Sequence, residues 1–160
     1  MVLGWVPSKV DSTIKAPSFQ SFTSFRERYS SQYLVTDEKP KQIGDYWLRW
    51  TGRRSYEGID LEPGAEPVLS GNILNLWSGF AVQPAAGSWQ MMQDHITHVL
   101  AGDDPAYATY IFKWMAWSVQ HPGERAEVAL VLRGGKGAGK GRFAYAMKKL
   151  FGQHGLQIFN

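Results

Sequence analysis

The stretch that most constrains the fold is a short apolar run followed by a glycine-rich loop and then by an amphipathic segment. The three parts read EVALVL, RGGKGAGKG and RFAYAMKKLF and together span residues 127–151. A short apolar run is typical of a buried parallel strand. The last part places Phe143, Met147, Leu150 and Phe151 on one face of a helix. The order of strand, glycine loop and helix therefore predicts the opening of an α/β domain.

The loop matches a spacing that is used to hold phosphate. Gly134, Gly139 and Lys140 fit G-x-x-x-x-G-K, but Gly141 stands where a Ser or Thr hydroxyl would bind magnesium. Glycines let successive backbone N–H groups turn toward an anion, and a helix N-terminus adds partial positive charge. We expect Lys140 to reach the terminal phosphates of a nucleotide. Water can replace the missing Mg²⁺ ligand. The alternative is a helix-entry turn that binds nothing.

Basic side chains gather around this loop. No carboxylate follows Glu127, whereas six basic residues do: Arg133, Lys136, Lys140, Arg142, Lys148 and Lys149. Such a block attracts polyanions, either nucleotide phosphates or a nucleic-acid backbone. The alternative is a solvated basic helix, and charge alone does not separate the two.

Two amphipathic helices are expected before the apolar run. Apolar residues recur on one helical face over 88–102, where Ser88 can cap the start. A second helix is expected after Asp104, with Pro105 at its first position, and must stop near Pro122. Because the turn between them is so short, we expect the two helices to pack as a hairpin.

The N-terminal part gives weaker signals. A short helix is predicted around residues 22–29. Residues 46–64 alternate aromatic and basic side chains and then turn, which predicts a strand or hairpin. In the connector that follows, Trp77 and Phe80 are expected to be core anchors. The predicted organisation has four segments: a poorly defined Ser/Thr-rich segment 1–44, an aromatic/basic hairpin and connector 45–87, a helical subdomain 88–123, and the start of the α/β domain at 124–160.

The aromatic and basic stretch is also a candidate nucleic-acid surface. Trp50, Arg53, Arg54 and Tyr56, with Trp47 and Arg49 beside them, could stack on a single strand of DNA and neutralise its phosphates. A structural hairpin with an exposed basic edge is an equally good interpretation.

Other candidate sites are weaker. His95 and His98 have a helical spacing that can bind metal, but no third ligand follows nearby, so we expect a surface or core role and no metal site. Asp103 and Asp104 are assigned to a helix cap. The absence of cysteine excludes disulfides, thiolate metal sites and a Cys nucleophile.

The N-terminal residues MVLGWVPSKV lack a basic segment followed by an apolar core, so we expect no signal peptide. No apolar run approaches the roughly 20 residues that cross a bilayer. We expect a soluble, cytoplasmic protein with no membrane partner.

Three stretches together resemble the phage and plasmid primase–helicase proteins of the superfamily-three type. They read NLWSGFAVQP, HITHVLAGDDPAYATYIFKWMAWSVQHP and VALVLRGGKGAGKGRFAYAMKKLFG, and the similarity covers about residues 45–160. The resemblance implies an AAA-like P-loop NTPase core after a helical hairpin and a mixed, loop-rich N-terminal region. It implies ATP and Mg²⁺ as cofactors of the full-length protein. The implied ATP-phosphate loop consists of Gly134, Gly135, Lys136, Gly137, Ala138, Gly139, Lys140 and Gly141, with Lys140 as the phosphate-contacting, catalytic lysine.

The chain departs from this family in one important respect. The family places acidic residues for magnesium and water activation after the loop helix, and an arginine finger later still, but no Asp or Glu follows Glu127 here. We therefore expect the N-terminal portion of a larger ATPase, with the P-loop core truncated after its first strand, loop and helix, although LQIFN (156–160) resembles the opening of a second strand.

The expected function is the ATP-binding portion of a phage-type replicative DNA helicase or primase–helicase. We expect it to be inactive in hydrolysis alone, to form a homo-oligomer when complete, and to work in the bacterial host cytoplasm if it is phage-encoded. The alternatives are a non-enzymatic single-stranded DNA-binding module and another P-loop NTPase, such as a small kinase. The kinase is disfavoured because small kinases usually begin at the P-loop strand.

Overall fold

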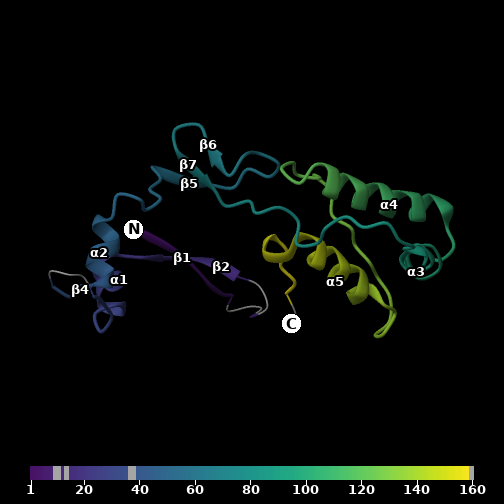
Figure 1. Cartoon of the computed structure of the whole chain (residues 1–160). Coiled ribbons are helices and arrows are strands. Elements are labelled where there is room, and N and C mark those ends of the chain that lie inside the picture. Colours follow the sequence, from purple (N-terminus) through teal and green to yellow (C-terminus); the bar gives the residue numbers. More distant parts are fainter. Residues whose placement is uncertain (9–11, 13–14, 36–38, 159–160) are drawn as a thin grey trace. The chain divides into compact units, whose positions relative to one another are not determined.

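The computed structural model describes residues 1–8, 12, 15–35 and 39–158 (Figure 1). The chain forms two compact units, Met1–Tyr56 and Glu57–Asn160. The described residues contain five α-helices and three small sheets, so the protein is of mixed α/β composition. The predicted segment 45–87 spans the boundary between the two units.

The first unit contains two antiparallel strand pairs. Strands β1 (Val2–Pro7) and β2 (Lys15–Gln20) pair over their whole lengths, with Val2 opposite Gln20. The shorter strands β3 (Tyr33–Leu34) and β4 (Lys41–Gln42) form the second pair. The pairs belong to separate two-stranded sheets.

Helix α1 (Phe22–Arg28) confirms the helix that was predicted around residues 22–29. Its N-cap is Ser21, whose hydroxyl accepts a hydrogen bond from the backbone N–H of Ser24 at 3.0 Å. This side chain satisfies one of the N–H groups that every helix start leaves unpaired.

Helix α2 (Ile43–Arg49) corrects the predicted strand or hairpin, which is wrong over residues 46–49. Gly44 and Leu48 are buried one helical turn apart, and a Cβ atom on Gly44 would lie 3.1 Å from Cα of Arg26 in α1. The ring of Trp47 also packs 5.0 Å from that of Phe25. Close packing against α1 therefore outweighs the strand preference of the aromatic residues.

The second unit begins with a three-stranded sheet. Strand β7 (Ile73–Asn75) lies between β5 (Gly58–Asp60), which is parallel to it, and β6 (Val68–Leu69), which is antiparallel. The buried side chain of Asn75 organises the crossover between β5 and β6. Its Oδ1 atom accepts from the N–H of Glu62 at 3.0 Å, and its Nδ2 atom donates to the carbonyl oxygen of Glu62 at 2.7 Å.

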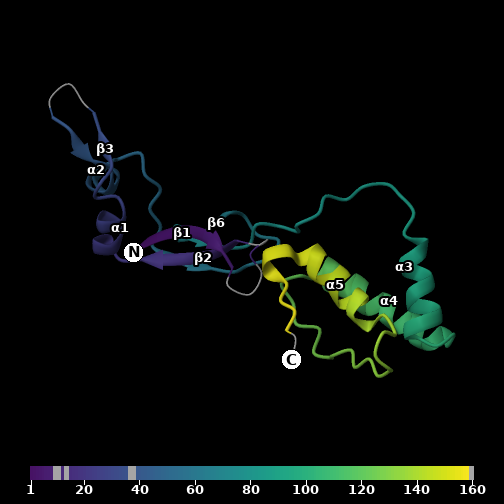
Figure 2. The same ribbon diagram turned by 90° about the horizontal axis from the view of Figure 1, so that it is seen from below.

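The predicted helix over 88–102 is confirmed, with an unexpected change of pitch. Helix α3 (Gln90–Asp94) continues directly into the π-helical turn η1 (His95–Leu100). A connector whose residues 82–89 are all exposed leads from the sheet to α3 (Figure 2). Ser88 accepts from the N–H of Gln90 at 3.3 Å, one residue before the N-cap.

Helix α4 (Pro105–Gln120) follows the prediction closely. Asp104 caps it by accepting from the N–H groups of Ala106 and Tyr107 at 2.8 and 3.2 Å. In the view where α4 lies lengthwise, α3 is seen almost end-on, so the two helices cross (Figure 1). The turn between η1 and α4 contains two positive φ angles, 61° at Gly102 and 64° at Asp103, which redirect the chain sharply.

Helix α5 (Lys140–Phe151) and the 3₁₀ turn η2 (Gly152–His154) close the second unit. The predicted inward positions Phe143 and Met147 are buried, and Leu150 and Phe151 pack against the same core. The buried cluster joins η1, α4 and α5 and consists of Ile96, Ala101, Ala108, Ile111, Phe143 and Met147.

Neither of the two strands predicted around the glycine loop is present among the described residues. Residues 128–135 lie outside any helix or strand, and so do residues 155–158, while residues 159 and 160 lie outside the described part. A strand exists only as part of a hydrogen-bonded ladder, and no described strand pairs with either run. The apolar character of 127–132 is used in packing instead, because Leu130 and Leu132 contact the helical core.

Candidate phosphate-binding loop

The glycine-rich loop turns tightly before it enters α5. The N–H of Ala138 donates to the carbonyl oxygen of Gly135 at 3.4 Å, which closes the turn. Gly137 and Gly139 have φ angles of 87° and 81°, a region that side chains with a Cβ atom rarely adopt. Gly139 is the N-cap of α5, and its carbonyl oxygen accepts the N–H of Arg142 at 2.9 Å. These two positions therefore require glycine.

The start of α5 presents unpaired donors. Within the described residues, the backbone N–H groups of Gly139, Lys140 and Gly141 have no hydrogen-bond partner, and α5 has neither a side-chain cap nor an acidic residue in its first turn. Residues 133–138 before it are exposed. Unpaired N–H groups and the positive end of the helix dipole are the elements of an anion site.

Lys140 folds back over its own loop. Its Nζ atom donates to the carbonyl oxygen of Gly134 at 2.7 Å and to that of Gly135 at 2.9 Å. These bonds hold the beginning of the loop to the helix start. Because an ammonium group carries three donors, one N–H bond remains for a ligand.

His95 lies directly against the other end of the loop. Its Nε2 atom is 3.2 Å from the carbonyl oxygen of Gly139, 44 residues later in the chain. A Cβ atom on Gly139 would lie 2.3 Å from Cε1 of His95. The sequence position of His95 predicts only a metal ligand, a surface residue or a core residue, and nothing in the sequence spacing indicates this contact.

His98 points to a different partner, although it shares a helix with His95. Its Nδ1 atom lies 2.5 Å from Oδ1 of Asp103, and both side chains are largely exposed. The hydrogen bond that His98 donates to Asp103 and the negative charge of that carboxylate raise the pKa of His98. Asp103 therefore pairs with His98, while Asp104 alone caps α4. In the described ranges, no three His, Cys, Asp or Glu side chains are grouped so that they could hold a metal ion.

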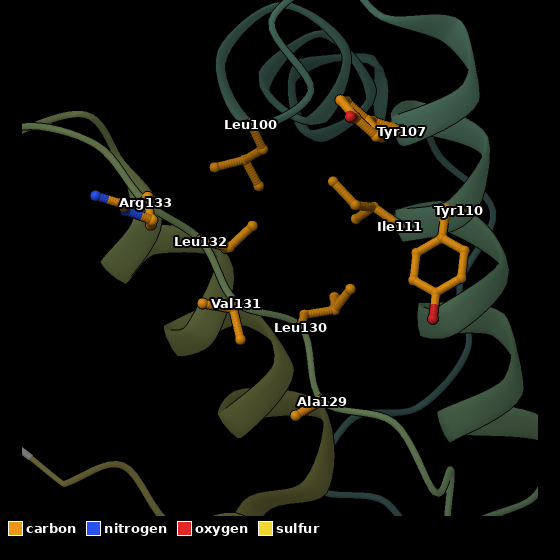
Figure 3. Close-up of a pocket in the computed structure, with 9 residues that line it drawn as sticks. All are labelled: Leu100, Tyr107, Tyr110, Ile111, Ala129, Leu130, Val131, Leu132 and Arg133. Atoms are coloured by element: carbon orange, nitrogen blue, oxygen red, sulfur yellow. The ribbon is translucent and has the colours of Figure 1, made fainter.

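An apolar groove of about 350 Å³ lies next to the residues that lead into the loop (Figure 3). Leu100, Tyr107, Tyr110 and Ile111 line one side, and the run from Ala129 to Arg133 lines the other. Arg133 is thus both the end of the groove and the residue that precedes Gly134.

The predicted anchors Trp77 and Phe80 pack against the end of α5. The ring of Trp77 stacks on that of His154 at 4.5 Å, and the ring of Phe80 meets that of Phe151 edge-on at 5.4 Å. Burial lowers the pKa of His154. These contacts hold the connector after β7 to the helix that carries the loop lysine.

The candidate DNA-contacting residues lie in the first unit, at the end of α2 and in the turn after it. Trp50 is 48% exposed, and its ring folds over Gly52, where a Cβ atom would meet Cζ2 at 2.7 Å. Arg54 is exposed, and Arg53 and Tyr56 are half-buried. The structure thus provides a helix end followed by a turn, not the predicted hairpin.

Among the helices of the described ranges, none has the length and apolar character needed to span a membrane.

Comparisons with protein-family models, with curated proteins and with solved structures find no match to this chain. The loop geometry and the resemblance of its motifs are therefore the basis of the functional argument.

Proposed function

We propose that residues 134–141 bind the phosphates of ATP and that the chain is the ATP-binding portion of a phage-type replicative DNA helicase or primase–helicase. The observation that carries the nucleotide proposal is the combination of three unpaired N–H groups at Gly139, Lys140 and Gly141 with the ammonium of Lys140 above the same loop. The assignment to helicases rests on the motif resemblance alone.

Each part of the loop has a distinct role in this proposal. The backbone N–H groups donate to the phosphate oxygens, and the open glycines leave room for the close approach of the anion. The ammonium of Lys140 neutralises charge on the terminal phosphates. It holds two carbonyl oxygens at 2.7 and 2.9 Å, so it is already positioned over the loop.

The residues of the loop fit ATP better than they fit a directly bound magnesium ion. Gly141 offers no hydroxyl oxygen, and no carboxylate follows Glu127. Mg²⁺ would be held through water and the oxygens of ATP itself, as its preference for retaining waters allows. The ion supplies charge neutralisation at the phosphates when it is bound.

We expect this chain to bind ATP without hydrolysing it. Hydrolysis needs a positioned water and groups that stabilise the charge of the transition state. Lys140 and the backbone donors contact the phosphates before, during and after transfer, so they do not favour the transition state by themselves. No Asp or Glu follows Glu127 in this sequence, so no residue of the loop or of α5 supplies a carboxylate that could orient a water.

A calorimetric titration of the purified chain with ATP tests the proposal. Replacing Lys140 by Ala removes a charged donor, for which a loss of affinity of about tenfold to a hundredfold is expected. Lys149→Ala is the matched control, since Lys149 is exposed on the same helix and contacts the ring of Tyr145. Equal affinities in wild type and Lys140→Ala would refute the assignment of the loop.

A further inference from the structure

One contact links η1 to the loop. The imidazole of His95, which is half-buried, lies against Gly139 with Nε2 3.2 Å from the carbonyl oxygen. Because a carbonyl oxygen only accepts, Nε2 must carry the hydrogen of this bond. The same oxygen accepts the N–H of Arg142 at 2.9 Å. Two donors from different helices therefore fix the direction of the Gly139 carbonyl.

The direction of this carbonyl determines the direction of a ligand-binding donor. A trans peptide group is planar, and its C=O and N–H bonds point in opposite directions. The peptide that contains the Gly139 carbonyl also contains the N–H of Lys140. When His95 and Arg142 hold the oxygen on one side, the N–H of Lys140 is presented on the other, where it has no partner among the described residues.

The position of His95 is itself fixed by the core. The next residue, Ile96, is 0% exposed and packs in the cluster that contains Phe143 and Met147 of α5. A displacement of the His95 backbone would require η1 to move relative to α5. Gly139 cannot carry a side chain here, since its Cβ atom would overlap the ring of His95 at 2.3 Å.

We infer that His95 is a positioning residue of the phosphate loop, which orients the Gly139–Lys140 peptide so that the Lys140 N–H faces the bound phosphate. The inference rests on the proposed function and deepens it, because it assigns a role at the nucleotide site to a residue outside the glycine motif. Loss of the His95 bond leaves the carbonyl held by the N–H of Arg142 alone, which loosens the peptide and weakens phosphate binding without removing any group that contacts the ligand.

The test compares His95→Ala with His95→Gln in the full 160-residue chain, with ATP as the probe. The amide of Gln places a donor near the position of Nε2, so it can restore the bond to Gly139. His98→Ala is the matched control on the same helix, since His98 bonds Asp103 instead. Two readouts are used: the Kd for ATP by calorimetry, and amide hydrogen exchange of Lys140 to Arg142 without nucleotide.

We expect His95→Ala to raise the Kd by about threefold to tenfold, the effect of losing one hydrogen bond. Exchange at Arg142 should also become faster. His95→Gln should restore both values to within about twofold of wild type, and His98→Ala should change neither. If His95 acted only through packing, Gln would not restore ATP binding when the variants have equal thermal stability. Restored binding in His95→Gln therefore distinguishes positioning from packing.

Two results would overturn the inference in distinguishable ways. If wild type binds ATP and Lys140→Ala does not, but His95→Ala binds as tightly as wild type, the proposed function stands and the role of His95 is refuted. If wild type itself binds no ATP, the proposed function falls first, and His95 is then a packing residue whatever the exchange data show.

Discussion

The Nζ atom of Lys140 lies 2.7 Å from the carbonyl oxygen of Gly134, so the lysine at the start of α5 closes the loop that precedes it. Replacing Lys140 by Met keeps the apolar stem but removes all three donors. We expect faster amide exchange at Ala138, whose N–H closes the turn on the carbonyl oxygen of Gly135, in the free protein. The free energy of unfolding should change by less than about 1 kcal/mol, because the bonds are exposed. Lys149→Met is the control, and equal exchange in the two variants would contradict the closure of the loop by Lys140.

The most sensitive core position is Ile96, whose side chain is completely buried among η1, α4 and α5. Ile96→Ala should lower the free energy of unfolding of the second unit by about 2 to 5 kcal/mol, since it removes buried methyl groups and leaves a cavity. Val99→Ala is the matched control, because Val99 is 49% exposed on the same turn. Urea denaturation measures both, and similar losses would show that the core does not centre on Ile96.

The pair of His98 and Asp103 should give the protein a small pH dependence. The hydrogen bond and the charge of Asp103 raise the pKa of His98 above its ordinary value of 6.5. Because its pKa is higher in the folded state, protonated His98 stabilises the fold. This stabilisation is complete at pH values below the pKa of His98 in the unfolded chain, and it is lost as the pH rises through the pKa of His98 in the folded protein. An NMR titration of His98 measures the shift.

Asp103→Asn is the appropriate control variant for this titration. Asparagine tolerates the positive φ angle of 64° at this position, so the turn is preserved while the charge is removed. The pKa of His98 should then return toward 6.5. An unchanged pKa in Asp103→Asn would mean that the pair does not form in solution.

Single-stranded DNA remains a proposed partner of the first unit, through the exposed Trp50 and Arg54 with Arg53 and Tyr56 beside them. If both arginines contact phosphates, the double variant Arg53→Ala, Arg54→Ala should bind with a weaker salt dependence. The slope of the logarithm of the binding constant against the logarithm of the salt concentration should become about 1.4 smaller in magnitude. The charge-matched control replaces Lys15 and Arg28, which are exposed elsewhere in the same unit. Anisotropy titrations at several salt concentrations measure the slopes, and identical slopes in both double variants would exclude this surface.

Local signals in the sequence were sufficient for the helices of the second unit. Asp104 followed by Pro105 predicted the start of α4, and the spacing of Phe143 and Met147 predicted the buried face of α5. These features depend on caps and periodicity within one element. These predictions were correct because each of the residues lies within a few positions of its partner in the sequence.

Features that depend on distant partners could not be predicted in this way. The run at 127–132 has the composition of a strand, but strand formation requires a neighbour, and none pairs with it among the described residues. The aromatic stretch around Trp47 became a helix because Phe25 and Arg26 provide a surface for it. The contact of His95 with Gly139 is likewise determined by how η1 packs on α5.

The most direct test of the central claim is an NMR titration of the ¹⁵N-labelled chain with ATP, with pyrophosphate as a second probe that lacks the base. Binding through the open helix start predicts that the amide signals of Gly139, Lys140 and Gly141 shift with both ligands, and that Lys140→Ala needs about tenfold to a hundredfold more ATP to reach the same shifts. If those three amides remain unchanged at saturating ATP, or shift equally at equal ATP concentrations in Lys140→Ala, the loop is a helix-entry turn and not a phosphate site.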